Sequence, residues 1–246
     1  MAKLSGATFI EGQDLYTQSA APLAEIGQLA FDSYGNRYRY VKAGATLVTG
    51  NLLQEPAENT NFHAMTPSTV SAIGSKTFAV VLGWTAVTAG LFDDGILYVS
   101  AGTGIGQQFR IVSHDIQTST TGVCTFTVDR PVSIATVVAS SKITVRKNPY
   151  KGVIQYPLTT QTGGAVGVAL FALTDTYYGW IQSGGECAVL HDAGSNTSNG
   201  LTGIIPSAAV AGAVCLAAAD AANIIGFSRL VVDIDSTMNL AHLIID

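Results

Sequence analysis

Short segments in which apolar and polar side chains alternate, separated by glycine-containing turns, run through most of this 246-residue chain. Cys124–Val128 alternates apolar and hydroxyl side chains, and Ile143–Arg146 repeats the pattern. A period of two places successive side chains on opposite faces of a strand, whereas a helical pattern repeats every ~3.6 residues. The sequence therefore predicts an all-β fold of antiparallel β-sandwich or barrel domains.

Two hairpins are predicted from turn chemistry. Gln28–Asp32 and Arg37–Lys42 flank a turn that contains Gly-Asn, and the glycine-rich stretch 101–106 joins Ile96–Ser100 to Gln108–Val112. A dinucleotide-binding loop would need its third glycine where Gln107 stands, and a helix would have to follow it. A strand pattern follows instead, so we interpret this stretch as a hairpin turn.

The segment Asn148–Gly152 marks a boundary between two β-rich parts, because Pro149 favours extended geometry before it and Gly152 permits a sharp change of direction. We expect an N-terminal arm (residues 1–27), a β-rich domain (28–148) and a C-terminal β-sandwich or barrel domain (149–246). The strands predicted in the last domain are Ala165–Leu173, Tyr177–Gln182, Glu186–Leu190, Ala213–Ala217, Ser228–Ile234 and Leu240–Ile245.

Residues 1–27 lack sustained alternation but carry scattered apolar side chains, among them Phe9, Ile10, Leu15 and Tyr16. Such a segment is either a disordered tail or an extended arm that becomes ordered on a partner, and its apolar side chains favour the arm. We take these four residues as partner-contact candidates. Tyr177 is a fifth, because it faces away from Tyr178 and Trp180 on a strand with aromatic side chains on both faces.

Charged residues make up only 12% of the chain and hydrophobic residues 48%, whereas a soluble domain carries roughly 25% charged residues. A charge-poor surface suits a protein largely covered by neighbours. The net charge of −5 and the lack of a basic run make direct nucleic-acid binding unexpected. No apolar stretch is long enough to span a membrane, and no signal peptide is indicated, so we expect synthesis in a reducing cytoplasm.

Residues with chemical potential do not form a recognisable catalytic or metal-binding pattern. The four histidines and three cysteines lack metal-site spacing, so no metal or cofactor is expected. Asp93 and Asp94 fit a turn, and Asp233 and Asp235 share one strand face. A glycosidase needs two carboxylates opposed across roughly 5–10 Å, so a solvated strand face is favoured for the second pair. No catalytic residue is assigned, and the protein is not expected to be an enzyme.

Several stretches resemble virion proteins of tailed bacteriophages, most closely capsid decoration (cement) proteins. These stretches are Gly27–Asp32, Tyr38–Ala45, Gly95–Val112, Asn148–Tyr150, Gly167–Val168, Tyr178–Gln182, Gly212–Val214 and Ile225–Gly226. The resemblance implies a homotrimer that binds the major capsid protein on the outer surface of the virion and stabilises contacts between shell subunits.

Two alternative functions stay open. A tail, collar or fibre-base protein involved in host attachment would share the all-β pattern. A glycan-active enzyme would need opposed carboxylates in a cleft, which the sequence does not reveal. A major capsid subunit is less favoured, because the chain is short and lacks the long charged helix of such a subunit.

Overall fold

The computed structural model describes residues 8–10, 12–192, 202–218, 223–230 and 234–246. It is nearly all β, with 43% of residues in strands and 3% in helices, so the predicted fold class is confirmed. The helical residues form two short 3₁₀ helices, η1 (Gly12–Tyr16) and η2 (Thr60–Phe62). Within the described ranges, no helix is long and apolar enough to cross a membrane.

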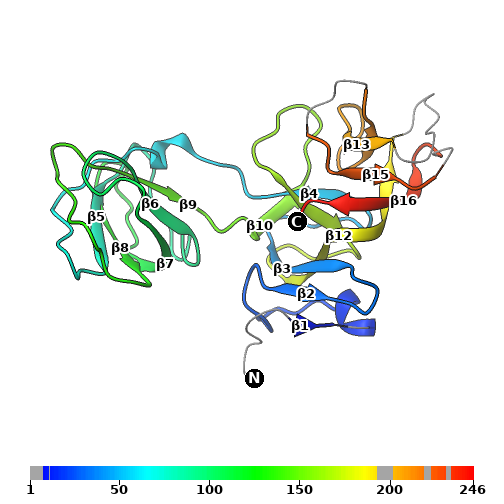
Figure 1. Cartoon of the computed structure of the whole chain (residues 1–246), viewed down its shortest axis with the longest axis horizontal. Coiled ribbons are helices and arrows are strands. Elements are labelled where there is room, and N and C mark those ends of the chain that lie inside the picture. The colour runs from blue at the N-terminus through cyan, green and yellow to red at the C-terminus, as the bar shows by residue number, and fades with distance from the viewer. Residues whose placement is uncertain (1–7, 11, 193–201, 219–222, 231–233) are drawn as a thin grey trace. The chain divides into compact units, whose positions relative to one another are not determined.

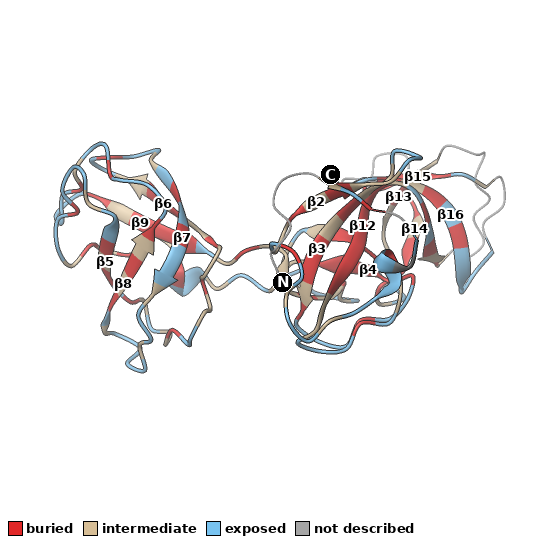
Figure 2. Cartoon of the chain, turned by 90° about the horizontal axis from the view of Figure 1, so that it is seen from below, coloured by how far each residue is buried: buried red, intermediate tan, exposed pale blue. Residues whose placement is uncertain are grey.

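The chain forms two compact units, each with its own hydrophobic core. Unit 1 comprises Met1–Ala57 and Pro149–Asp246, and unit 2 comprises Glu58–Asn148. The predicted boundary at residue 148 coincides with the end of unit 2. The predicted grouping of residues 28–57 with that unit differs from the structure, because their strands pair with strands of the C-terminal part. Buried residues line the strands of both units (Figure 2).

Unit 2 is a closed β-barrel (Figure 1). Its sheet order is β5 (Thr77–Val81), β8 (Val123–Val128), β7 (Gln108–His114), β6 (Ile96–Ala101) and β9 (Lys142–Arg146). The segment Met65–Pro67 closes the ring, because Met65 bridges to Ile143 on β9 and Pro67 to Val80 on β5. Apolar side chains of the alternating strands fill the interior, including Phe78, Leu97 and Phe126.

The glycine-rich stretch of unit 2 is the turn of the predicted β6–β7 hairpin. Gly102, Gly104 and Gly106 all have positive φ angles of 74°, 86° and 87°, which glycine adopts without steric penalty. The two strands pair antiparallel, with Leu97 opposite Phe109. The hairpin prediction is confirmed, and β7 stands where a nucleotide-binding loop would need a helix.

The first part of unit 1 is a second closed ring of strands. It contains β3 (Arg37–Ala43), β10 (Lys151–Gln155), β4 (Leu52–Gln54), β11 (Ala165–Ala169) and the first half of β12 (Tyr178–His191). The pairing of β12 with β3, in which Trp180 lies opposite Tyr40, closes the ring. Val41, Leu53, Val153 and Ile181 belong to the apolar core of this ring.

The second half of β12 continues into another ring, with β14 (Val214–Leu216), β13 (Gly203–Pro206), β15 (Gly226–Ser228) and β16 (Thr237–Ile244). The prediction of two strands separated near Gly184 is wrong, because β12 runs unbroken through a register shift at this point. Gly185 adopts φ +85°, and a Cβ there would lie 2.2 Å from Oδ1 of Asn36. These glycines therefore bend one long strand and do not end it.

The described part of the N-terminal segment packs against its own unit, which corrects the expectation of an arm ordered by a partner. β1 (Thr8–Phe9) pairs in parallel with β2 (Leu29–Phe31), and Ile10, Leu15 and Ala24 are buried. They cover aromatic side chains that project outward from β3 and β12, namely Tyr38, Tyr40 and Trp180. This aromatic surface gives the apolar residues of the segment an intramolecular partner.

Candidate functional site

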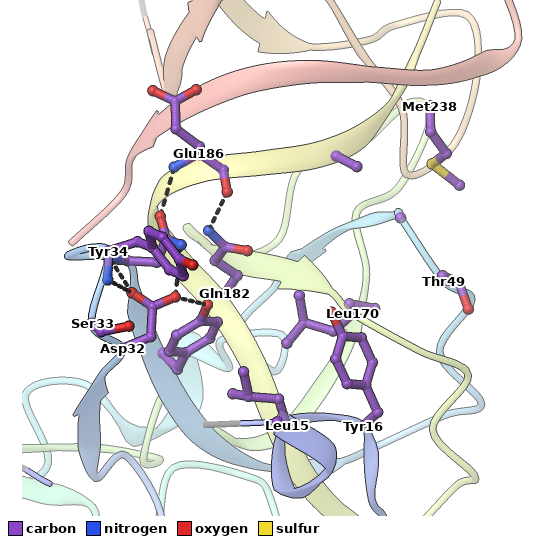
Figure 3. A pocket seen from close by; sticks show the side chains of 16 residues that line it. Leu15, Tyr16, Asp32, Ser33, Tyr34, Thr49, Leu170, Gln182, Glu186 and Met238 are labelled. Atoms are coloured by element: carbon purple, nitrogen blue, oxygen red, sulfur yellow. Dashed lines mark hydrogen bonds between the residues drawn. The ribbon is translucent and has the colours of Figure 1, made fainter. Parts of the chain in front are cut away.

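A groove with a volume of about 610 Å³ lies in unit 1 between η1, the β2–β3 turn and β12 (Figure 3). Its exposed border is formed by Tyr16, Tyr34 and Met238, and Tyr34 is 90% exposed. Leu170 contributes a half-buried apolar side chain to the wall, and Asp32 lies at the polar end. The groove therefore combines an apolar, largely aromatic rim with one polar end.

The carboxylate of Asp32 organises the β2–β3 turn. Its Oδ1 accepts hydrogen bonds from the backbone N–H groups of Tyr34 and Asn36, both at 2.9 Å. Its Oδ2 accepts from the Asn36 side-chain amide and the Tyr38 hydroxyl, both at 2.8 Å. Asp residues favour turns because they can bind the backbone that follows them. The sequence around Asp32 thus fixes the turn that presents Tyr34 to solvent.

These contacts also set the protonation states at the polar end of the groove. Burial opposes ionisation of Asp32, but the hydrogen bonds from Tyr38, Asn36 and the turn amides outweigh it and lower its pKa. Burial, together with the hydrogen bond to Asp32 and its charge, raises the pKa of Tyr38. Asp32 is therefore charged and Tyr38 neutral at pH 7, and both oxygens of Asp32 are used to hold the turn.

Glu186 reaches the groove through its backbone. Its N–H donates to Oδ1 of Asn36 at 2.9 Å, and its carbonyl accepts from Nε2 of Gln182 at 2.8 Å. Figure 3 shows the Glu186 carboxylate on the opposite side of β12 from Asp32. Asp32 and Glu186 therefore do not face each other as an acid and a base or nucleophile would.

The Glu186 carboxylate belongs to a surface ion-pair cluster. Its Oε1 accepts from Nη2 of Arg229 at 2.8 Å and lies 2.9 Å from Nδ1 of His242. Burial raises the pKa of Glu186, but the hydrogen bonds from Arg229 and His242 and the charges of these residues outweigh burial, so the net shift of the pKa is downward. This cluster joins β12, the residue that follows β15, and β16 on the surface, and it stabilises the charged form of Glu186.

The structure separates the predicted partner-contact residues into two groups. Phe9 is 81% exposed and Tyr16 is also exposed on the groove rim, so both are accessible to a partner. Ile10 and Leu15 are only 8% and 7% exposed, because they pack against the aromatic side chains of β3 and β12. Tyr177 is half-buried against the core of the first ring. Of the five predicted partner-contact residues, Phe9 and Tyr16 are therefore the two with exposed side chains.

The carboxylates and histidines that the sequence analysis considered for catalysis or metal binding do not form a site among the described residues. Asp233 lies outside the described residues, and Asp235 is exposed. Asp94 forms an ion pair with Arg110 at 2.8 Å, and the buried Nε2 of His114 accepts the backbone N–H of Phe92 at 3.1 Å. No group of three or more His, Cys, Asp or Glu side chains gathers in a metal-binding arrangement within the part of the chain that the structure describes.

The cysteines include two fully enclosed thiols. Burial, aided by the nearby charge of Asp115, raises the pKa of Cys124 to about 11, and burial raises that of Cys187 to about 12. Thiols with raised pKa values are poor nucleophiles at neutral pH. Cys124 and Cys187 are therefore buried, free thiols with a structural role.

The exposed residues that the sequence did not single out include Tyr34, Met238 and, in unit 2, Trp84. The position of Tyr34 inside a predicted turn could have revealed its exposure, because turn residues lie at the surface. The sequence around Met238 and Trp84 carries no comparable signal of exposure.

No protein-family model, curated protein or solved structure matches the chain.

Proposed function

We propose that this protein is a virion structural protein of a tailed bacteriophage, a capsid decoration (cement) protein. It binds the major capsid protein on the outside of the shell and stabilises contacts between shell subunits. The observation that carries this proposal is the exposed apolar rim of the unit 1 groove, formed by Tyr16, Tyr34 and Met238 on a chain with few charges.

The groove suits a protein partner better than a reaction. The carboxylate of Asp32, at the polar end, is fully used by the turn, whereas Tyr16 and Tyr34 expose their rings. Tyrosine offers a large contact area at a low cost in conformational entropy and is enriched among residues that dominate interface energies. A partner that inserts an apolar side chain between Tyr16 and Tyr34 would bury surface without leaving Asp32 unpaired.

The division into two units supports a bridging role. Each unit has its own core and its own exposed apolar residues; in unit 2 these include Ile73 and Ile105. A cement protein has to contact more than one shell subunit, which two separately packed units can do. Repetition over many copies, in the proposed homotrimers, multiplies weak contacts into strong attachment.

The alternative is a tail, collar or fibre-base protein that takes part in host attachment. The exposed Trp84 of unit 2 favours it, because an exposed aromatic side chain on a loop is suited to contact with a host surface. The location of the protein in the particle distinguishes the two functions.

Rebinding to particles that lack the protein tests the proposal. Purified protein should co-sediment with such particles, and the double variant Tyr16→Ala/Tyr34→Ala should bind the shell with at least about tenfold lower affinity. Leu158→Ala, which changes an exposed apolar residue that does not line the groove, is the matched control and should bind normally. Binding to tails and not to shells, or full occupancy by the double variant, would contradict the proposal.

A further inference from the structure

Trp84 of unit 2 combines exposure with an unfavourable backbone conformation. Its side chain is 77% exposed and its φ is +73°. A bulky residue rarely adopts this left-handed region, because it strains the backbone, and such strained residues cluster at functional sites. Burial of the ring in the core does not account for this strain, because the ring lies in solvent.

The loop that carries Trp84 is fixed on both sides. On one side, the N–H of Trp84 donates to the carbonyl of Thr120 at 2.8 Å, and Val87 and Gln117 exchange backbone hydrogen bonds at 2.8 and 2.9 Å. On the other, Gly83 packs against η2, where a Cβ would lie 2.4 Å from the carbonyl oxygen of Asn61. The indole is therefore held on a rigid support.

The surroundings of Trp84 are polar but uncharged. The two segments that pair here, residues 82–87 and 116–123, contain no Asp, Glu, Lys or Arg. Thr118, Ser119, Thr120 and Thr121 form an exposed run of hydroxyls. Among the described residues, none forms a hydrogen bond with the side-chain hydroxyl of Thr118, Thr120 or Thr121. These three hydroxyls are therefore available to a ligand.

The η2 side supplies directed polar groups. The side-chain amides of Asn59 and Asn61 both donate to Oγ1 of Thr85, at 3.3 and 2.8 Å. Because Thr85 Oγ1 already accepts two hydrogen bonds, its own proton is free to be donated outward. Asn61 is exposed and its Oδ1 can accept a hydrogen bond. A donor and an acceptor thus lie next to the residue that presents the indole.

An apolar strip adjoins this loop. Val81 of β5 and Val123 of β8 lie directly opposite each other in register, and both are exposed on the outside of the barrel. Val81 precedes Trp84 by three residues, and Val123 follows Thr120 by three. The site therefore offers an aromatic ring and a small apolar surface bordered by hydroxyl and amide groups.

We propose that Trp84 and the two segments beside it form a binding site for a neutral carbohydrate. A sugar ring has an apolar C–H face that can stack on an indole, and hydroxyls that both donate and accept hydrogen bonds. A protein hot spot is typically enclosed by further apolar contacts, whereas hydroxyls flank this tryptophan. A nucleic acid or an acidic polysaccharide would require cationic side chains, which neither segment contains.

Titration of the full-length protein with neutral oligosaccharides tests this site. The probes are maltohexaose, mannohexaose and a galactose oligomer, with heparin as the charged comparison. Trp84 and the buried Trp180 are the two tryptophans of the chain, so fluorescence changes caused by contact with the exposed indole can be resolved. We expect at least one neutral oligosaccharide to bind with a millimolar or lower Kd, and saturation-transfer NMR should map its ring protons to the contact.

Variants assign the binding to Trp84. Trp84→Ala should lower the affinity at least about tenfold, while Trp84→Phe, which keeps an aromatic face, should retain part of it. Ile105→Ala, at another exposed position of the same barrel, should bind like the unaltered protein. Circular dichroism confirms that each variant is folded.

Three results would overturn the carbohydrate site: no binding of any neutral probe, binding of heparin alone, or equal binding by Trp84→Ala. The outcome is independent of capsid attachment. Loss of shell binding in the groove variants with intact sugar binding, or the reverse, separates this site from the proposed function.

Discussion

Tyr40 and Trp180 lie opposite each other on β3 and β12, with their ring centroids 5.1 Å apart and their planes at 62°. This edge-to-face pair projects from the outside of the first ring and would be exposed without the N-terminal segment. Ile10 and Leu15 pack over it, and the backbone N–H of Leu23 donates to the Tyr40 hydroxyl at 3.0 Å. Ile10, Leu15 and Ala24 are therefore part of the folded core of unit 1.

Truncation of a buried residue in this segment should destabilise unit 1. Leu15→Ala removes buried apolar contacts, so we expect the free energy of unfolding to fall by about 2–4 kcal/mol. Phe9→Ala, at an exposed position of the same segment, should change it by less than about 0.5 kcal/mol. Urea unfolding followed by Trp180 fluorescence in a Trp84→Phe background measures both. Equal stability of the two variants would show that the segment does not pack as described.

Unit 2 should be removable without unfolding unit 1, because it is inserted between two neighbouring antiparallel strands. β4 and β10 pair through Gln54 and Ile154, and a Cβ on Gly152 would lie 3.6 Å from Pro56. Replacement of Glu58–Asn148 by a short Gly-Ser turn should leave a cooperatively folding protein with buried Trp180. Calorimetry measures whether the shortened protein unfolds cooperatively, and fluorescence reports whether Trp180 is buried. A molten or aggregated product would mean that unit 1 depends on the inserted barrel.

Local patterns in the sequence predicted the hairpins well, because turn glycines and alternation act over a few residues. The β6–β7 hairpin and the β2–β3 turn are both found where Gly102–Gly106 and Gly35 place them. The break predicted near Gly184 was wrong for a physical reason. The pair Gly184-Gly185 is typical of a turn in a local sequence pattern. The hydrogen bonds of β12 with β3 and β16 nevertheless keep the strand continuous across this pair.

The groove was only partly predictable, because it is assembled from distant segments. Tyr16 was identified from its apolar character, whereas its neighbours in the groove, Leu170 and Met238, come from β11 and β16 regions far along the chain. The buried positions of Ile10 and Leu15 followed from an aromatic surface formed by β3 and β12 together. Such long-range complementarity leaves no periodic signal in a single sequence.

Stability should fall in acid. The pKa values of Asp32, Glu186 and Asp246 are lowered; for Asp246 the main cause is its hydrogen bonds with Arg39. A folded-state pKa below the unfolded value contributes stability that is complete above about pH 5 and is lost as the pH falls through the folded pKa. We therefore expect the urea concentration at the midpoint of unfolding to decrease as the pH is lowered from about 5 toward 2.

The Asp32 contribution can be isolated. Asp32→Asn removes the charged acceptor of the Tyr38 hydroxyl, so it should cost about 1–3 kcal/mol at pH 7, with a smaller difference at pH 3. Asp175→Asn, which changes an exposed carboxylate, should follow the pH profile of the unaltered protein. Parallel pH profiles of the Asp32 variant and the unaltered protein would contradict this role of the carboxylate.

Trp84 should be unfavourable for stability. At φ +73°, asparagine is tolerated better than other non-glycine residues, and the exposed indole contributes little packing. We expect Trp84→Asn to be more stable than Trp84→Ala by about 0.5–1 kcal/mol, because alanine keeps the strain of the left-handed conformation. Thermal unfolding of the two variants measures the difference. A less stable asparagine variant would contradict backbone strain at this position.

The temperature at which particles release their DNA tests the proposed cementing role most directly. Each copy is expected to contribute only about a few kcal/mol after the costs of association, but this gain is repeated over the whole shell. Particles with and without the protein are heated while a fluorescent dye reports released DNA. We expect particles without the protein to open at a lower temperature, and added protein, but not the Tyr16→Ala/Tyr34→Ala variant, to restore the higher one. Identical release temperatures, accompanied by lost adsorption to host cells, would contradict the capsid role and support the tail alternative.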